Sequence, residues 1–507
     1  MRPTAFAAFA VLAAARLCAA DADFCIAGTV VNALTGEPIR RAAVTIPQAA
    51  TLTDAAGAFG FCGLAAGWYY ANGEKPGFVA NGERIAVGPS REDVRLRLQP
   101  LAVIKGKVTD ADGEALENVL VQLLSLLVRD GRRQARVESA VATDDRGEYR
   151  LPGLLPGRYV LRVAGGQCGA STENANSNQA FAPVYYSGAT SVPSAAPLAV
   201  EAGQERTADF AVTPAASYHI RGTVTGYSAA IPAKIELLRA DDDLSAAPVV
   251  LNSATGAFHV DQVVPGSYVL RVTQGEDSQR LRGEQAVQVS RSDVAGVVLT
   301  LSAPVAVKGA VHVADASTQT PAPPNCSIKL SPAGVSISTD DEPEAATSAE
   351  GSFELTGVLP GRYRVRMDCA NGYIASARFG DADLLALEEI VISPGVTPSP
   401  LDAVLGTDGA TLDATPVQTI EGVTPWLLLF PDSGSELHTR LARFAGKVSL
   451  TGIAPGDYQA FVWTGSPAEF EYAVSAVRQS WANHAVSVHL AARDHQSITL
   501  KVPPESK

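Results

Sequence analysis

The sequence predicts an all-β protein, a tandem array of small antiparallel β-sandwich domains of the transthyretin-like or immunoglobulin-like kind. Apolar and polar residues alternate in short runs, and no stretch keeps a helical period. Turn-forming residues separate these runs, and 44 Gly and 32 Pro supply them. A related unit also returns along the chain at intervals of roughly 95 residues, which is the signature of a repeat architecture.

The first twenty residues, MRPTAFAAFAVLAAARLCAA, predict a secretory signal peptide cleaved near Ala20. An early positive charge precedes an apolar run, and small residues precede the cleavage point. A lipid anchor at Cys18 is the alternative, although Leu17 is a poor residue before a lipidated cysteine. No later run is long and apolar enough to span a membrane, so we expect a secreted, periplasmic or cell-surface protein.

Composition sets the number of domains and excludes one class of partner. A chain of 507 residues exceeds one core and predicts roughly three to five domains. With 46% hydrophobic and 18% charged residues, it can bury several cores. The formal net charge of −13 would repel phosphate backbones, so we expect no nucleic-acid partner.

A Pro-Gly corner followed by tyrosine marks each repeat. The stretches GLLPGRYVLRV, QVVPGSYVLRV, GVLPGRYRVRM and GIAPGDYQAFV begin at residues 153, 262, 357 and 452, and GLAAGWYY at 63 is a degenerate copy. Proline fixes φ and glycine accepts a positive φ, so the corner predicts a type II turn. The predicted turn glycines are Gly67, Gly157, Gly266, Gly361 and Gly456.

Side chains alternate in the strand that follows each corner. In 158–163, we expect Tyr159, Leu161 and Val163 to face the core, while Arg158 and Arg162 face solvent. Outward arginines on separate domains do not share a cleft, which argues against an anion site.

Each unit also has an opening strand, which sets the predicted boundaries. We expect a signal peptide at 1–20 and five sandwich domains at 21–100, 101–215, 216–303, 304–405 and 406–507. The second domain contains an insertion at 167–198, and the fifth is divergent.

The opening GTVVNALTGEPIRRAAVTI and the following TDAAGAFGFCGL resemble the carboxypeptidase regulatory-like domain. Its pattern is G-x-V-x-(D/N)-x-x-T-G-x-P-(I/L)-x-x-A-x-V, then T-D-x-x-G-x-F. The resemblance implies a transthyretin-like, carbohydrate-binding-like fold. Such domains occur as appendages on metallocarboxypeptidases, receptors and surface proteins, so the resemblance implies a fold without deciding an activity.

Catalytic motifs are missing from the sequence, and we expect no enzymatic activity, cofactor or metal. A zinc peptidase needs a motif such as H-E-x-x-H, and no histidine has that context. No G-x-S-x-G elbow is present either. Calcium at Asp110, Asp112 and Glu117, or at 241–243, is the remaining alternative to ordinary Asp-containing turns.

Aromatic clusters are the candidates for binding sugar. They are Trp68-Tyr69-Tyr70, Tyr185-Tyr186, Trp463 and Trp481, with core packing as the alternative role. We place the ligand contact in the insertion of the second unit, at Phe181, Tyr185 and Tyr186, because loops on rigid sandwiches carry binding residues. One of the two tyrosines is expected to face solvent.

Strand parity pairs four cysteines. Cys326 shares the face of Ile328, and Cys369 continues the face of Met367, while Cys25 and Cys62 both lie opposite inward residues. In an exported chain this predicts the disulfides Cys25–Cys62 and Cys326–Cys369. Cys168 is then left unpaired.

The function that these features favour is a non-catalytic, secreted or envelope binding scaffold, with carbohydrate as the ligand class and a glycan or another envelope protein as partner. A structural spacer or protein-interaction rod is the alternative, and an accessory or inactive relative of a metallocarboxypeptidase is a third. Exposed aromatic side chains in a planar row would distinguish the first from the second.

Overall fold

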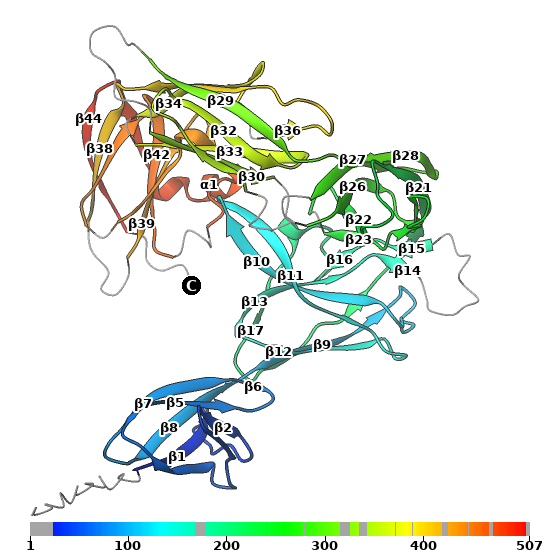
Figure 1. The fold of residues 1–507 in the computed structure, drawn as a ribbon, viewed down its shortest axis with the longest axis vertical. Helices are drawn as coiled ribbons and strands as arrows, with labels where there is room; N and C mark the ends of the chain where they lie inside the picture. Colours follow the sequence, from blue (N-terminus) through cyan, green and yellow to red (C-terminus); the bar gives the residue numbers. More distant parts are fainter. Residues whose placement is uncertain are drawn as a thin grey trace, which may run out of the picture. The chain divides into compact units, whose positions relative to one another are not determined.

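The computed structural model describes residues 24–167, 179–242, 244–276, 280–314, 325–333, 342–370, 372–387, 389–417, 424–444, 446–465 and 470–502 (Figure 1). The chain is nearly all β, in small and mostly antiparallel sheets, which confirms the predicted fold class. It forms two compact units: 1–104 with 151–157 and 199–207, and the remainder. Within the described ranges, no helix is long and apolar enough to cross a membrane.

Residues 24–100 form two four-stranded sheets, in the orders β4-β1-β8-β6 and β3-β2-β5-β7. Their strands alternate as predicted: in β8, Val94, Leu96 and Leu98 are buried between exposed neighbours. Both sheets contribute to one core. The strands are β1 (Phe24–Asn32), β2 (Ala43–Ile46), β3 (Ala49–Leu52), β4 (Ala58–Leu64), β5 (Gly67–Glu74), β6 (Phe78–Val79), β7 (Asn81–Val87) and β8 (Arg91–Pro100).

Residues 102–216 form the sheets β11-β10-β13-β16, β12-β9-β18 and β14-β15-β20, with β17 beside β13 and β19 beside β9. The strands β10 and β11 form a long hairpin, drawn in cyan in Figure 1. The elements are β9 (Ala102–Thr109), β10 (Leu120–Arg129), β11 (Arg132–Ala142), β12 (Glu148–Leu154), β13 (Gly157–Val163), β14 (Gly166–Gln167), β15 (Gln179–Phe181), β16 (Val184–Tyr185), η1 (Val192–Ser194), β17 (Leu198–Val200), β18 (Glu205–Thr207), β19 (Phe210–Ala211) and β20 (Pro214–Ala216).

Residues 218–300 form the sheets β24-β25-β21-β28 and β23-β22-β26-β27 around one core. The strands are β21 (Tyr218–Thr225), β22 (Ala233–Arg239), β23 (Ser245–Ala247), β24 (Val250–Leu251), β25 (Ala257–Val263), β26 (Gly266–Gln274), β27 (Leu281–Val289) and β28 (Val294–Thr300).

Residues 305–406 form the sheets β32-β29-β37-β34-β35 and β31-β30-β33-β36, again around one core. The strands are β29 (Val305–Val313), β30 (Cys326–Pro332), β31 (Glu344–Ala346), β32 (Ser352–Val358), β33 (Gly361–Cys369), β34 (Tyr373–Phe379), β35 (Ala382–Asp383), β36 (Ile390–Ile392) and β37 (Leu401–Gly406).

Residues 410–500 form the sheets β41-β38-β44 and β40-β39-β42-β43. A core lies between them, and a second aromatic cluster packs on the outer face. The elements are β38 (Ala410–Pro416), β39 (Trp426–Pro431), η4 (Glu436–His438), β40 (Arg440–Arg443), β41 (Val448–Ile453), β42 (Gly456–Trp463), α1 (Ser475–Ser480), η6 (Ala482–His484), β43 (Val486–Leu490) and β44 (His495–Leu500).

The opening strand of each segment pairs in parallel with a later strand, within sheets that are otherwise antiparallel. Examples are β1 with β8 and β21 with β28. The glycine of the G-x-V motif lies at this pairing. A Cβ atom on Gly28 would lie 1.9 Å from the carbonyl oxygen of Val94, and one on Gly222 would lie 2.2 Å from that of Val297. The motif therefore needs glycine so that two strands can approach each other.

The repeated tyrosine forms a tyrosine corner. The hydroxyl groups of Tyr268, Tyr363 and Tyr458 donate to the carbonyl oxygen four residues earlier, at 2.8, 2.8 and 2.7 Å. All three side chains are buried, as the alternation predicted. Tyr69 makes the same bond at 3.1 Å. The bond ties each strand to the turn before it, as in other β-sandwiches.

The prediction of a left-handed corner glycine is wrong at Gly67, Gly157 and Gly266, whose φ is not positive. The prediction of a positive φ holds at Gly361 and Gly456, where φ is 156° and 153°, values that L side chains rarely adopt. Each of the five glycines begins a strand. The left-handed residue lies four positions earlier, at Gly63, Gly153, Gln262, Gly357 and Gly452, with φ between 58° and 78°.

At Gly266 the tyrosine ring gives a further reason for glycine. A Cβ atom on Gly266 would lie 3.2 Å from the ring of Tyr268, which is tighter than ordinary contact.

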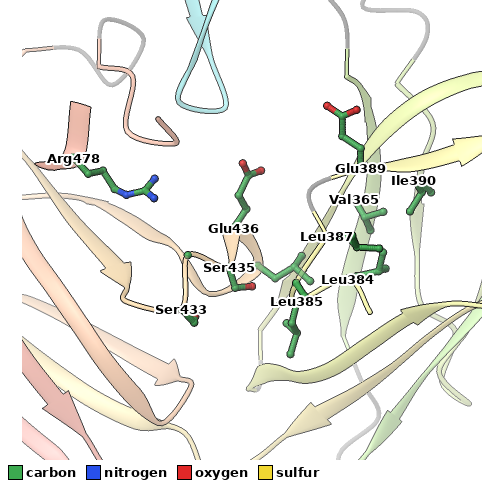
Figure 2. Close-up of a pocket in the computed structure, with 13 residues that line it drawn as sticks. Val365, Leu384, Leu385, Leu387, Glu389, Ile390, Ser433, Ser435, Glu436 and Arg478 are labelled. Carbon is green, nitrogen blue, oxygen red and sulfur yellow. The ribbon is translucent and has the colours of Figure 1, made fainter. Parts of the chain in front are cut away.

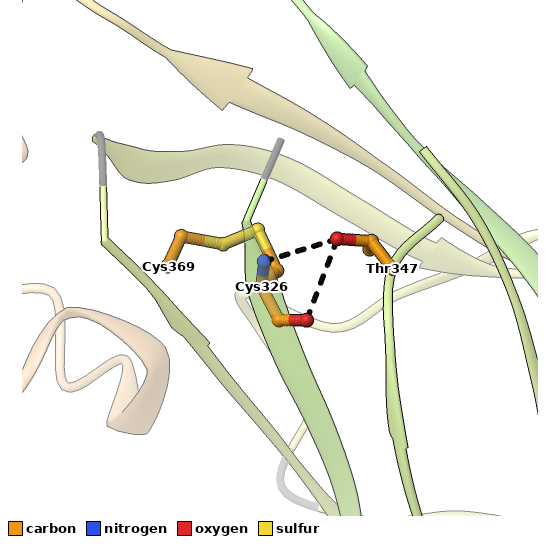
Figure 3. Close-up of a disulfide and its surroundings, with 3 residues drawn as sticks. All are labelled: Cys326, Thr347 and Cys369. Carbon is orange, nitrogen blue, oxygen red and sulfur yellow. Dashed lines mark hydrogen bonds between the residues drawn. A yellow bond between two sulfur atoms is a disulfide. The ribbon is translucent and has the colours of Figure 1, made fainter. Parts of the chain in front are cut away.

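Both predicted disulfides are confirmed. Cys326 and Cys369 lie opposite each other on β30 and β33, with Cα atoms 4.1 Å apart. The side-chain oxygen of Thr347 accepts a hydrogen bond from the amide of Cys326 at 3.0 Å (Figure 3). Cys25 and Cys62 join β1 to β4. Cys168, the signal peptide and residues 168–178 of the insertion lie outside the described residues.

Candidate functional site

Of the four aromatic clusters, the one on β5 is the most exposed to solvent. Trp68 is 64% exposed and Tyr70 is 55% exposed. By contrast, Tyr185 is fully buried. Trp463 stacks on Phe470, with ring centroids 4.6 Å apart, and belongs to the outer aromatic cluster of residues 410–500.

The register of the sheet places Trp68 and Tyr70 on one face. They are two residues apart on β5, so both point away from the core, whereas Ala71 points into it. Arg84 on β7 lies directly opposite Tyr70. Its guanidinium carbon lies 4.7 Å from the centroid of the Trp68 ring, a cation–π arrangement.

Tyr70 lies across the neighbouring strand. A Cβ atom on Gly82 of β7 would lie 2.4 Å from the tyrosine ring, so glycine makes room for the ring against the backbone. Strand β5 lies inside its sheet, between β2 and β7, so its backbone is held on both sides. We name the group Trp68, Tyr70, Gly82 and Arg84 the aromatic surface. It offers two exposed aromatic rings beside a cation on a rigid sheet.

The aromatic residues predicted to contact ligand lie mainly in the interior. Phe181 and Tyr185 are 1% and 0% exposed. Tyr186 is half-buried, and its ring lies 5.9 Å from that of Phe210, edge to face. Glycan binding by these three residues stays a prediction. Burial removes the ring faces of Phe181 and Tyr185 from solvent, and only Tyr186 keeps part of its ring at the surface.

Tyr185 has a structural partner in the third segment. Its hydroxyl donates to the carboxylate of Asp242, which also accepts a hydrogen bond from the amide of Leu244 at 2.9 Å. Burial, followed by the charge of Asp242, raises the pKa of Tyr185 well above its ordinary value. Leu244 joins Tyr185 in a small hydrophobic cluster. The insertion therefore packs against Asp242 and Leu244.

The prediction that the corner-strand arginines face solvent is wrong at Arg162, which is fully buried. Its guanidinium donates to the side chain of Gln122 at 2.7 Å and to the carbonyl of Ser245 at 3.1 and 3.2 Å. Burial lowers the pKa of Arg162. Burial does not alternate along β13: Val160, on the same face as Arg162, is also fully buried, and Tyr159 is half-buried. Leu244 of the third segment packs with Val160 and helps to cover this face.

The Asp-containing turns hold their own backbone. Asp110 accepts hydrogen bonds from the amides of Asp112 and Glu114, at 3.0 and 2.9 Å. Asp144 does the same for the amides of Arg146 and Glu148. Such bonds are the usual reason for Asp in a turn. Within the part of the chain that the structure describes, no three His, Cys, Asp or Glu side chains are grouped to hold a metal.

The long hairpin β10–β11 was not predicted from the sequence. Its tip makes ion pairs with later segments: Arg132 with Glu436 at 2.6 Å, Arg133 with Glu471 at 2.7 Å, and Asp130 with Arg366. The Asp-Gly pair at 130–131, between two β-rich runs, is a hairpin signal that could have revealed it.

Two hollows lie near this tip. One, of about 200 Å³, has leucines such as Leu384 and Leu387 on one side and Ser435, Glu436 and Arg478 on the other (Figure 2). A larger cleft of about 640 Å³ is lined by β11, the turn after β22, β33 and residues near α1. Glu389 lines both hollows.

Comparison with known proteins identifies one part of the chain. A model of the carboxypeptidase regulatory-like domain matches residues 103–213. No curated protein matches the sequence. A minor pilin, GBS52 of Streptococcus agalactiae, is 13% identical over 38% of this chain and 96% of its own, with a TM-score of 0.21. The shaft pilin SpaA of Lactobacillus rhamnosus GG is 11% identical over 38% and 97%, with a TM-score of 0.22. The TIE protein of Bacillus anthracis is 10% identical over 92% and 76%, with a TM-score of 0.17.

The family match covers β9 through β19, including the G-x-V opening at Gly106 and the corner at Gly157. It agrees with the resemblance that the sequence motifs indicated. Residues 103–213 are therefore a carboxypeptidase regulatory-like domain.

Proposed function

We propose that this chain is an exported, non-catalytic binding scaffold of five β-sandwich domains that holds a glycan on the aromatic surface of the first. The proposed boundaries are those predicted from the repeats. The proposal rests on the exposed pair Trp68 and Tyr70. Two large aromatic rings on one sheet face expose apolar surface to water without contributing to a core, and such surfaces mark interaction sites.

The chemistry of the surface fits a sugar. The π face of an aromatic ring is electron-rich and attracts the C–H groups on the face of a pyranose ring. Arg84 beside Trp68 supplies hydrogen-bond donors to the hydroxyl groups at the edge of the sugar ring. Thr45 on β2 and Asn72 on β5 lie opposite each other in the register, which adds polar groups to the same face.

Export is supported by the leader-like first twenty residues and by the two disulfides. Disulfides persist in oxidising compartments outside the cytosol. Both join strands within one segment, so each stabilises its own core.

Retention of the full chain on insoluble polysaccharides tests the proposal, with cellulose, chitin and xylan as probes. Trp68→Ala and Tyr70→Ala should each weaken retention at least about tenfold, the scale of losing a central aromatic contact. Both side chains are exposed, so thermal stability should stay almost unchanged.

Leu52→Ala is the matched control. Leu52 is 64% exposed on β3, at the edge of the same sheet and two strands from β5. This variant should retain polysaccharide like the parent chain. If the parent binds none of the probes, or if Leu52→Ala weakens retention as much as Trp68→Ala, the glycan proposal fails.

A structural spacer is the second candidate, and the long hairpin favours it. The end of β10–β11 is held by ion pairs from Asp130, Arg132 and Arg133, and the amide of Ala473 donates to the carbonyl of Gly131 at 2.9 Å. Such contacts restrain neighbouring segments, which a spacer needs.

A further inference from the structure

The cleft of about 640 Å³ gathers charged side chains from distant parts of the sequence. Four arginines and four carboxylates line it: Arg132, Arg133, Arg362, Arg364, Asp241, Asp242, Glu389 and Glu471. Small apolar residues, among them Val474, Ala476 and Val477, form another part of its wall. Its volume lies within the range of roughly 300 to 1,000 Å³ that is typical of ligand sites.

Opposite charges in this cleft are already paired. Arg133 lies 2.7 Å from Glu471, and Arg364 lies 3.0 Å from Glu389. Asp241 is held by Arg239 through two hydrogen bonds, of 2.9 and 2.6 Å. A charged ligand would have to separate one of these pairs in a partly desolvated site, which is costly.

A hydroxyl group can join such a pair without separating it. It donates its hydrogen to the carboxylate oxygen and accepts from a guanidinium N–H at the same time. Neighbouring hydroxyls on one ring can therefore bridge successive Arg–carboxylate pairs, while the C–H face of the ring packs on Val477 and Ala476. A neutral ligand that carries many hydroxyl groups meets these conditions.

We infer that this cleft is a second binding site, for a neutral oligosaccharide. The inference does not rest on the aromatic surface, which lies in the other compact unit. Arg362 is the most accessible of its guanidinium groups: its side chain is 45% exposed, and its contact to Glu389 is long, at 3.4 Å. Arg362 can therefore turn one edge toward a ligand.

The repeats supply a matched control for Arg362. Arg158 occupies the same position in an identical LPGRY corner and is also exposed. Arg362 lines the cleft, whereas Arg158 does not belong to its lining. Loss of either arginine removes the same charge from the same kind of strand, so a difference in binding between the two variants reports on the cleft.

Isothermal titration of the full chain tests the inference, in a Trp68→Ala/Tyr70→Ala background that removes the aromatic surface. The probes are cellotetraose, maltotetraose and chitotetraose, with tetragalacturonate as the acidic comparison. We expect at least one neutral probe to bind. Arg362→Ala and Glu471→Gln should weaken it at least about tenfold, the scale of losing a hydrogen bond to a charged group. Arg158→Ala should leave it unchanged.

Ala476→Trp fills the cleft without removing a charge, and should also abolish binding at unchanged thermal stability, because Ala476 is exposed. The inference is overturned if no neutral probe binds, if tetragalacturonate binds more tightly than the neutral probes, or if Arg158→Ala weakens binding as much as Arg362→Ala. The two proposals can fail separately. If the parent chain binds no insoluble polysaccharide but the double variant still binds a neutral tetrasaccharide, the proposal for the aromatic surface fails and the inference about the cleft stands.

Discussion

Replacing Gly28 by alanine should destabilise the first sandwich by about 2 to 4 kcal/mol. The added Cβ atom would lie 1.9 Å from the carbonyl oxygen of Val94 and 2.7 Å from its carbon. Both are backbone atoms, so no side-chain rotation relieves the contact. Strands β1 and β8 must separate to admit the added atom.

The magnitude follows from what this separation breaks. Overpacking of a well-packed interior costs about 1 to 3 kcal/mol. Each weakened ladder hydrogen bond between β1 and β8 adds about 0.5 to 1.5 kcal/mol. For a domain of this size, 1 kcal/mol corresponds to a shift of about 4 to 8 °C in melting temperature.

Gly60→Ala is the control, because a Cβ atom there would lie 3.9 Å from Ala27, an ordinary contact. It should be neutral, or stabilising by up to about 1 kcal/mol through the unfolded chain. Calorimetry of the full chain measures stability, and hydrogen exchange of peptides from β1 and β8 locates the change. Equal stabilities of the two variants would refute the role assigned to the G-x-V glycine.

Three other changes test the contacts described above. Tyr363→Phe removes the buried donor to the carbonyl of Leu359 and should cost about 1 to 3 kcal/mol in urea unfolding; a cost near zero would contradict the tyrosine corner. Gly131→Val places a Cβ atom 2.4 Å from the ring of Tyr472, so hydrogen exchange at 470–474 should accelerate, and unchanged exchange would show that the hairpin tip is not seated there. Burial lowers the pKa of His438 below 6.5, so the unfolded chain binds a proton at this residue at a higher pH than the folded chain does. The free energy of unfolding should therefore fall as the pH drops from 6.5 toward the folded pKa. His438→Gln should reduce this pH dependence in urea titrations between pH 5 and 8. An unchanged slope would assign the pH dependence to other groups.

The sequence predicted the fold because strand alternation and turn chemistry are local. Inward positions such as Tyr363 on β33, and Leu96 and Leu98 on β8, are buried as the period of two required. The disulfides followed from the same parity. The parallel pairing of β1 with β8 was not predicted, because nothing local marks which strand will lie beside Gly28.

Contacts between segments could not be predicted from the sequence for a related reason. Arg162 has the outward parity of a solvated residue, but it is buried, and the carbonyl of Ser245 in the third segment accepts its hydrogen bonds. Tyr185 looked like a ligand contact because it lies in an insertion, and its partner Asp242 is distant in sequence. Parity tells which face a side chain takes, whereas burial depends on what covers that face.

The same distinction accounts for the different burial of the outer sheet faces in this chain. The repeat builds one sheet face into a core in every segment, and the opposite face is free to vary. On β13 that face holds Arg162 and is covered, and on β42 it carries Phe461 within an aromatic cluster. On β5 it carries Trp68 and Tyr70, and both stay exposed. Outer faces of corner strands are thus either covered by packing or left exposed, and the exposed aromatic face of β5 is the one that we propose for recognition.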